Sequence, residues 1–156
     1  MALEEALRWE ESGGVGVEFY GLYEKHFSEC TLNEGVLEKL QEAKDKGYQN
    51  IILSSCEHQA LVSQCHRLGI DDLFTSIMGV NDLVGGSKVE NGLRWLKDTN
   101  TDVNECMYIG DTNADYETAA ALGIQDITLV SLGHQSYERL KKLHDHTVQT
   151  FAEVII

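Results

Sequence analysis

Gly110-Asp111-Thr112-Asn113-Ala114-Asp115 follows the apolar run Cys106-Met107-Tyr108-Ile109 and opens an alanine-rich segment that is predicted to be helical as far as Gly123. This order places the carboxylates of Asp111 and Asp115 at the carboxyl end of a buried strand, the edge at which open α/β sheets bind ligands. Two carboxylates so close together repel each other unless a cation or a proton lies between them, and Mg2+ suits such oxygen ligands best. The alternative is that both residues cap the helix that begins here.

The rest of the chain alternates between helical and strand patterns. Apolar residues at helical spacing predict helices over 34–46, 57–68 and 88–97, with a further helix from Gln135 through Leu140 and a weak terminal stretch over 151–156. Short apolar runs predict strands over 51–53, 76–80, 106–109 and 126–130. This alternation is typical of a single α/β domain in which crossover helices connect the strands of a parallel sheet.

Composition narrows the class of protein. The 156 residues include 26 acidic and 12 basic side chains, for a formal charge of -14, so the electrostatic footprint for binding nucleic acid or an anionic membrane is missing. The four cysteines lack the spacing of a metal site, and we expect buried thiols in a reducing compartment. The sequence has no apolar stretch long enough to cross a bilayer and no signal-peptide pattern, so the expected location is cytoplasmic.

Polar side chains follow several of the predicted strands. Ser54 and Ser55 come after the first strand, Asp111 and Asp115 after the third, and Lys88 begins a helix that can reach the same edge. Hydroxyls, an ammonium and a carboxylate pair holding Mg2+ form a set that binds a phosphoryl group. Singly, each of these residues also fits a turn, a solvated surface charge or a helix cap.

With these motifs the chain resembles the haloacid dehalogenase superfamily, specifically its phosphoglycolate phosphatase-like branch. The resemblance covers roughly residues 31 to 156. It is carried by Ile51-Ile52-Leu53-Ser54-Ser55, by Gly86-Ser87-Lys88 and above all by Gly110-Asp111-Thr112-Asn113-Ala114-Asp115, with support from Asn33-Glu34-Gly35-Val36 and Ala121-Leu122-Gly123-Ile124.

The resemblance implies a reaction and a role for each matching residue. Ser54 and Ser55 would bind the phosphate, and Lys88 would steady both the nucleophile and the transferring phosphoryl group. Asp111 and Asp115 would hold Mg2+, with Asp111 counted together with Lys88 among the catalytic residues. The implied reaction is hydrolysis of the phosphate monoester of a small metabolite through an aspartyl phosphate.

One part of the family pattern is missing. Its first motif, a strand ending in Asp-x-Asp, supplies the nucleophile, yet this chain has no Asp before Asp45. Covalent phosphoryl transfer needs that carboxylate within attack distance. We therefore expect a Rossmann-like parallel sheet with helices on both faces that lacks its usual central first strand, in a chain that is weakly active or inactive alone.

Three interpretations of this departure stay open. In the first, residues 1–30 are the helical remnant of a cap domain, with a helix over 19–27, and residues 31–156 are the core of a longer phosphatase. In the second, residues 14–20 form a degenerate central strand with Glu18 in place of the nucleophile. In the third, the chain is a non-catalytic relative that binds a phosphorylated ligand or a protein partner, with a homo-oligomer completing the sheet.

Overall fold

The computed structural model describes residues 29–80, 87–132 and 135–156. The chain divides into two compact units, Met1–Thr31 and Leu32–Ile156, and nearly all described residues belong to the second. The predicted helix over 19–27, the predicted strand over 14–20 and its Glu18 lie outside the described residues, as does Gly86.

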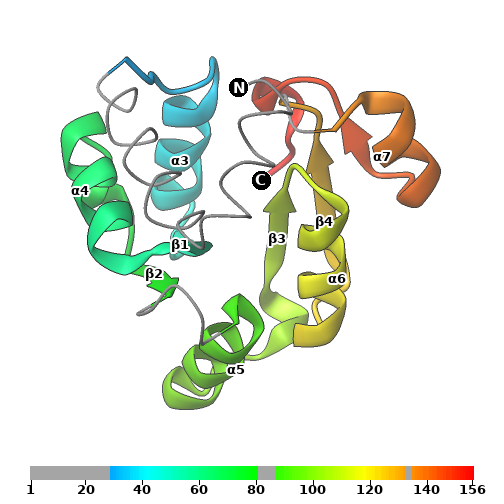
Figure 1. Ribbon diagram of the computed structural model, residues 1–156. Coiled ribbons are helices and arrows are strands. Elements are labelled where there is room, and N and C mark those ends of the chain that lie inside the picture. Colours follow the sequence, from blue (N-terminus) through cyan, green and yellow to red (C-terminus); the bar gives the residue numbers. More distant parts are fainter. Residues whose placement is uncertain (1–28, 81–86, 133–134) are drawn as a thin grey trace, which may run out of the picture. The chain divides into compact units, whose positions relative to one another are not determined.

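Helices and strands alternate along the second unit (Figure 1). The helices are α3 (Val36–Asp45), α4 (His58–Leu68), α5 (Lys88–Thr99), α6 (Asn113–Leu122) and α7 (Tyr137–Leu143). The strands are β1 (Ile51–Glu57), β2 (Ser76–Val80), β3 (Met107–Gly110), β4 (Asp126–Val130) and β5 (Thr147–Val148). Short 3-10 turns are η1 (Asp71–Leu73), η2 (Val103–Glu105) and η3 (Phe151–Glu153). The predicted α/β class is confirmed.

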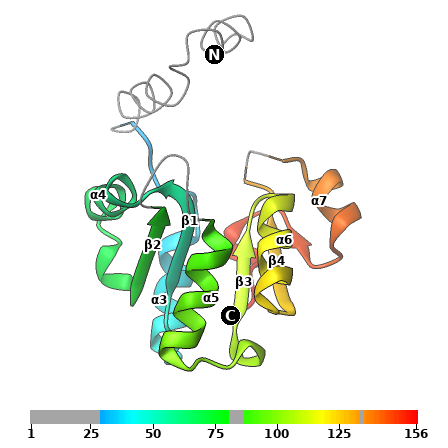
Figure 2. The same ribbon diagram turned by 60° about the horizontal axis from the view of Figure 1, so that its bottom comes forward.

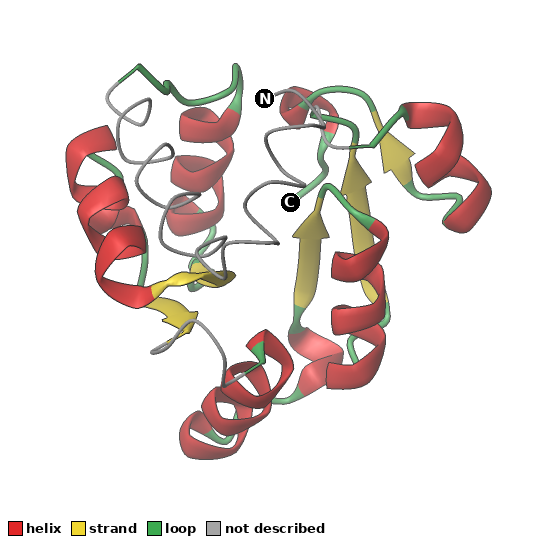
Figure 3. Ribbon diagram, viewed as in Figure 1, coloured by secondary structure: helices red, strands yellow, loops and turns green. Residues whose placement is uncertain are grey.

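The strands form two parallel sheets (Figure 3). In one sheet β1 pairs with β2, with Ile51 opposite Ser76. In the other, β3 pairs with β4 and β4 with β5. Within the described ranges no strand pairs with both β1 and β3. Each of these two strands therefore has one edge that no described strand pairs with.

The period of two along β1 sends neighbouring side chains to opposite faces of its sheet. Ile52 packs with Leu61 and Cys65 of α4, whereas Leu53 packs with the cluster that includes Leu122 of α6. Helices α4 and α5 both contact β1 and β2. The two faces of this sheet are therefore covered by different helices, as predicted.

Helix α5 links the two sheets, because it contacts β1 and β2 as well as α6 (Figure 2). Gly92, in the middle of α5, permits this packing. A Cβ at Gly92 would lie 2.8 Å from Cδ2 of Leu122 and 3.1 Å from Cδ2 of Leu53. Glycine in a helix interior lowers helix stability relative to alanine, and here it admits a side chain from β1 and one from α6 to the same point.

Burial differs between the strands. Ile127, Thr128, Leu129 and Val130 of β4 are all buried, and the last three are fully so. By contrast, every residue of β3 and the apolar residues 51–53 of β1 are only half-buried. β1 and β3, each with an edge that no described strand pairs with, thus keep apolar side chains partly in contact with water, a contact that a further layer or strand would remove.

Several element boundaries differ from the prediction, and the end of β1 is the one that bears on the site. Strand β1 continues to Glu57, so Ser54 and Ser55 lie within this strand and not after it. Regular pairing with β2 stops at Leu53 and resumes at Glu57, and Ser54 Oγ accepts a hydrogen bond from the backbone N–H of Cys56 at 3.1 Å inside this irregularity. Strand β5 was not predicted.

The cysteines are not uniformly buried. Cys65 is buried, Cys56 and Cys106 are half-buried, and Cys30 is exposed, contrary to the expectation for that residue. Burial raises the pKa of the Cys65 thiol, which keeps it protonated at neutral pH. Within the described residues, the helices are too short or too polar to cross a membrane.

Candidate functional site

The turn between β3 and α6 is held by a reciprocal helix cap. Thr112 is the N-cap residue of α6, and its Oγ1 accepts a hydrogen bond from the backbone N–H of Asp115 at 3.2 Å. In return, Asp115 Oδ2 accepts hydrogen bonds from the backbone N–H groups of Thr112 and Asp111, each at 3.1 Å, and from Thr112 Oγ1 at 2.8 Å. Asp115 therefore does cap the helix, as the alternative interpretation proposed.

The second oxygen of Asp115 faces away from the cap. Asp115 Oδ1 forms an ion pair with Lys88 Nζ and accepts a hydrogen bond from Tyr108 Oη at 3.4 Å. The pair is well covered, with side-chain exposures of 16% for Lys88 and 11% for Asp115. Lys88 is the first residue of α5, where a positive charge opposes the helix dipole, and Asp115 is the partner that stabilises it there.

Protonation follows from this arrangement. Burial raises the pKa of Asp115, but the hydrogen bond and charge of Lys88, with donors from Thr112 and Asp111, outweigh burial and hold that pKa below its usual range. Burial lowers the pKa of Lys88, but Asp115 and Tyr108 outweigh it and raise that pKa above its usual range. Burial raises the pKa of Tyr108. At neutral pH the site therefore holds an ammonium, a carboxylate and a protonated phenol.

Gly110 gives Asp115 the room to reach this position. A Cβ at residue 110 would lie 2.3 Å from Cβ and 2.6 Å from Cγ of Asp115. Both are atoms near the root of the side chain, which cannot move aside without moving the helix. The glycine before Asp111 is thus required for close approach of α6 to the end of β3.

Of the predicted site residues, the structure joins Lys88 to Asp115 directly and Asp111 to Asp115 through its backbone N–H. Ser54 is half-buried in β1 and Ser55 is exposed. Within the described part of the chain, no hydrogen bond or ion pair connects either serine with Lys88 or Asp115. Their phosphate-binding role stays a prediction.

The metal assignment can be tested against the chemistry of the carboxylates. The described residues contain no group of three or more His, Cys, Asp or Glu side chains that could hold a metal ion. Both oxygens of Asp115 already accept hydrogen bonds, so ligation by Asp115 would require it to release donors. Mg2+ is usually bound by one or two carboxylates and completes its coordination shell with water and substrate phosphate. The half-buried carboxylate of Asp111 is compatible with this coordination.

Three residues of the site were not singled out from the sequence. The Thr112-x-x-Asp115 spacing is a capping-box pattern and could have been recognised. Tyr108 and Gly110 are two residues apart on β3, so the Tyr108 side chain lies on the face of the sheet on which Gly110 leaves room for Asp115. Gln135, which contacts Asn113 from 22 residues away, has no local signal in the sequence.

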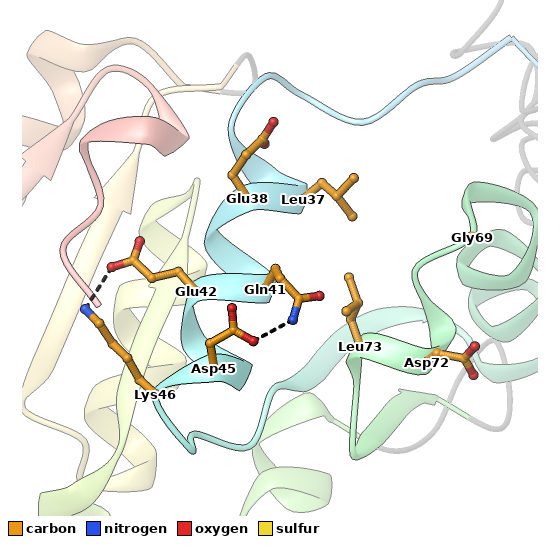
Figure 4. Close-up of a pocket in the computed structure, with 9 residues that line it drawn as sticks. All are labelled: Leu37, Glu38, Gln41, Glu42, Asp45, Lys46, Gly69, Asp72 and Leu73. Carbon is orange, nitrogen blue, oxygen red and sulfur yellow. Dashed lines mark hydrogen bonds and ion pairs between the residues drawn. The ribbon is translucent and has the colours of Figure 1, made fainter.

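A separate groove of about 730 Å3 lies between α3 and residues 69–73 (Figure 4). Four carboxylates line it, those of Glu38, Glu42, Asp45 and Asp72. Hydrogen bonds from Lys46 and then Lys39 lower the pKa of Glu42. None of the predicted site residues lines this groove, so it is not the candidate site.

Comparison with known proteins assigns the family. The sequence model of the haloacid dehalogenase-like hydrolases matches residues 7–129. A search of curated proteins finds no match. Among solved structures, a predicted phosphatase from Clostridium acetobutylicum is 22% identical, with a TM-score of 0.80, over 92% of this chain and 68% of that one.

Two further structures have the same fold. A beta-phosphoglucomutase from Clostridium difficile is 21% identical over 99% of this chain and 65% of that one, with a TM-score of 0.71. A predicted phosphoglycolate phosphatase from Haemophilus somnus is 18% identical over 92% of this chain and 65% of that one, with a TM-score of 0.74. The chain spans 60% to 68% of the length of the solved structures first matched. The family model covers most of the chain, and the chain therefore belongs to the haloacid dehalogenase-like hydrolases.

Proposed function

We propose that this chain carries the phosphoryl-binding half of a Mg2+-dependent phosphate monoester hydrolase whose substrate is a small phosphorylated metabolite. The observation that supports this most directly is the covered ion pair of Lys88 and Asp115 beside Asp111 at the carboxyl end of β3. Ligands of open α/β sheets bind at this edge. Members of the family generally use Mg2+.

Each residue has a role that follows from its chemistry. Lys88 keeps its positive charge and is held in one place by Asp115, so it can offset the charge of a transferring phosphoryl group without reorganising. Asp111 would hold Mg2+, which when bound neutralises charge on the phosphoryl oxygens. Ser54 and Ser55 would donate hydrogen bonds to those oxygens.

Turnover also needs a nucleophile, and the sequence has no Asp before Asp45. We therefore propose weak or no hydrolysis by this chain alone. The second candidate function is a non-catalytic protein of the same family that binds a phosphorylated ligand or a protein partner. The free edges of β1 and β3 among the described residues favour this candidate, since such an edge accepts a strand from a second copy of the chain. A cytoplasmic location stays a prediction.

The test is hydrolysis of p-nitrophenyl phosphate with and without Mg2+, beside Mg2+ titration by calorimetry. Asp111→Asn and Glu18→Gln are the variants, and Asp126→Asn, an exposed carboxylate at the opposite end of β4, is the matched control. Turnover that requires Mg2+ and Asp111 supports the hydrolase, and its loss in Glu18→Gln identifies the nucleophile.

The other outcomes separate the two candidates. Mg2+ binding that depends on Asp111, without turnover, supports the non-catalytic relative. A folded protein whose Mg2+ affinity is the same in wild type, Asp111→Asn and Asp126→Asn contradicts the metal role of Asp111. Sedimentation at increasing concentration tests the second copy, because a homo-oligomer that completes the sheet must dissociate on dilution.

A further inference from the structure

The carboxamide of Gln135 makes two hydrogen bonds with Asn113 next to the candidate site, one with its backbone and one with its side chain. The backbone N–H of Asn113, the first residue of α6, donates to Gln135 Oε1 at 3.0 Å. Gln135 Nε2 donates in turn to Asn113 Oδ1. Both residues are half-buried, and Gln135 comes shortly after the end of β4. This clamp therefore ties the segment after β4 to the turn after β3.

The clamp completes a row of three consecutive backbone donors. The N–H groups of Asp111 and Thr112 both point to Asp115, which lies within the same turn and helix. The next N–H, that of Asn113, points instead to Gln135, which is 22 residues away. Asp115 thus anchors the turn from inside α6, and Gln135 anchors it from the segment between β4 and α7.

A helix cap alone does not explain this contact. Water can satisfy the first N–H groups of a half-exposed helix end, so capping does not require a side chain from a distant segment. Gln135 uses both its acceptor and its donor on one residue, which fixes the orientation of the turn as well as its distance. Functional side chains need such support from a neighbouring element to keep their geometry.

We propose that Gln135 is a positioning residue, which through Asn113 holds the turn that carries Asp111. The metal role of Asp111 rests on the function proposed above, whereas the positioning itself does not. The proposal predicts that loss of the Gln135 carboxamide loosens the whole turn, including the two donors that Gln135 does not touch.

Amide hydrogen exchange of the full chain, followed by NMR, tests this directly. In Gln135→Ala the amide of Asn113 should exchange about 3- to 10-fold faster, the range that one lost hydrogen bond gives. The amides of Asp111 and Thr112 should also exchange faster, although their acceptor is unchanged. Gln125→Ala, which removes an exposed glutamine at the other end of β4, is the matched control and should leave these rates unchanged.

Two further measurements make the result decisive. Asn113→Ala removes only the side-chain acceptor and keeps the backbone N–H that donates to Gln135 Oε1, so exchange at residue 113 should be faster than in wild type and slower than in Gln135→Ala, whereas exchange as slow as in wild type argues against the clamp. In a Mg2+ titration of Gln135→Ala the affinity should fall several-fold. Faster exchange at Asn113 alone, with Asp111 and Thr112 unchanged, overturns the positioning role. If wild type binds no Mg2+, the metal role fails and the exchange rates still decide the positioning.

Discussion

Replacing Asp115 with Ala should destabilise the protein far more than replacing its partner Lys88 with Met. In Asp115→Ala the Lys88 ammonium, whose side chain is 16% exposed, loses its ion-pair partner. The backbone N–H groups of Asp111 and Thr112 lose their acceptor as well. Removing one partner of a covered ion pair costs about 3–5 kcal/mol of unfolding free energy.

Lys88→Met should cost less, because the Asp115 carboxylate that remains still has other hydrogen-bond donors. The methionine keeps most of the apolar stem of the lysine, and Asp115 keeps its hydrogen bonds from the backbone of Asp111 and from both donors of Thr112. A carboxylate in the first turn of a helix is also favoured by the helix dipole. The expected cost is about 1.5–3 kcal/mol, the value of one hydrogen bond to a charged group.

Urea unfolding at pH 7 measures both costs. In the double variant Lys88→Met/Asp115→Ala no ammonium is left without a partner when the carboxylate is removed. The loss of unfolding free energy in the double variant should therefore be smaller than the sum of the two single losses by about 1–3 kcal/mol. Asp126→Ala is the control on an exposed carboxylate, and Asp115→Asn serves if Asp115→Ala does not fold. The reasoning is refuted if Lys88→Met costs as much as Asp115→Ala, or if the two costs add.

Three further predictions follow from named contacts. Gly110→Ala should cost about 1–3 kcal/mol in urea unfolding, because the new Cβ overlaps the root of Asp115, and an unchanged midpoint would contradict the close approach. The lowered pKa of Asp115 stabilises the folded protein at pH values above about 3.9, the ordinary pKa of an aspartate. The free energy of unfolding of wild type should therefore exceed that of Asp115→Asn by less and less as the pH falls below about 4. A difference that stays constant with pH would argue against the lowered pKa. The hydrogen bond from His66 to Asp71 raises the pKa of His66, so NMR titration should place it above about 6.5, and Asp71→Asn should lower it.

Much of the fold was predictable because its strands carry local signals. The predicted bounds of β2 and β4 agree with the structure, since each is an apolar run of strand length between polar segments. Strand β5 was missed because Thr147 and Val148 pair only with the end of β4, a contact that no local pattern encodes. The length of β1 was wrong because its pairing is irregular after Leu53.

The sequence predicted that Lys88 and Asp115 lie at the same edge of the sheet, but not which atoms they contact. The end of a strand pointed to Asp115 and the start of a helix pointed to Lys88, and the structure joins these two residues. The sequence could not decide whether Asp115 caps the helix or meets a cation, because both need a carboxylate at the same position. The direction of each oxygen is set by Tyr108 and the turn, which only the folded chain brings together.

Helix α5 begins at Lys88 and packs against β1 and β2 of one sheet and against α6, and within the described residues no backbone pairing joins β1 to β3. Thermodynamic linkage follows from this arrangement. A phosphorylated compound that binds Lys88 only when α5 is docked adds its binding free energy to that of the assembled core, about 2.7 kcal/mol at a concentration 100 times its Kd. A ligand that binds more tightly at this edge therefore raises the melting temperature more, so melting temperatures rank candidate substrates even for a chain without turnover.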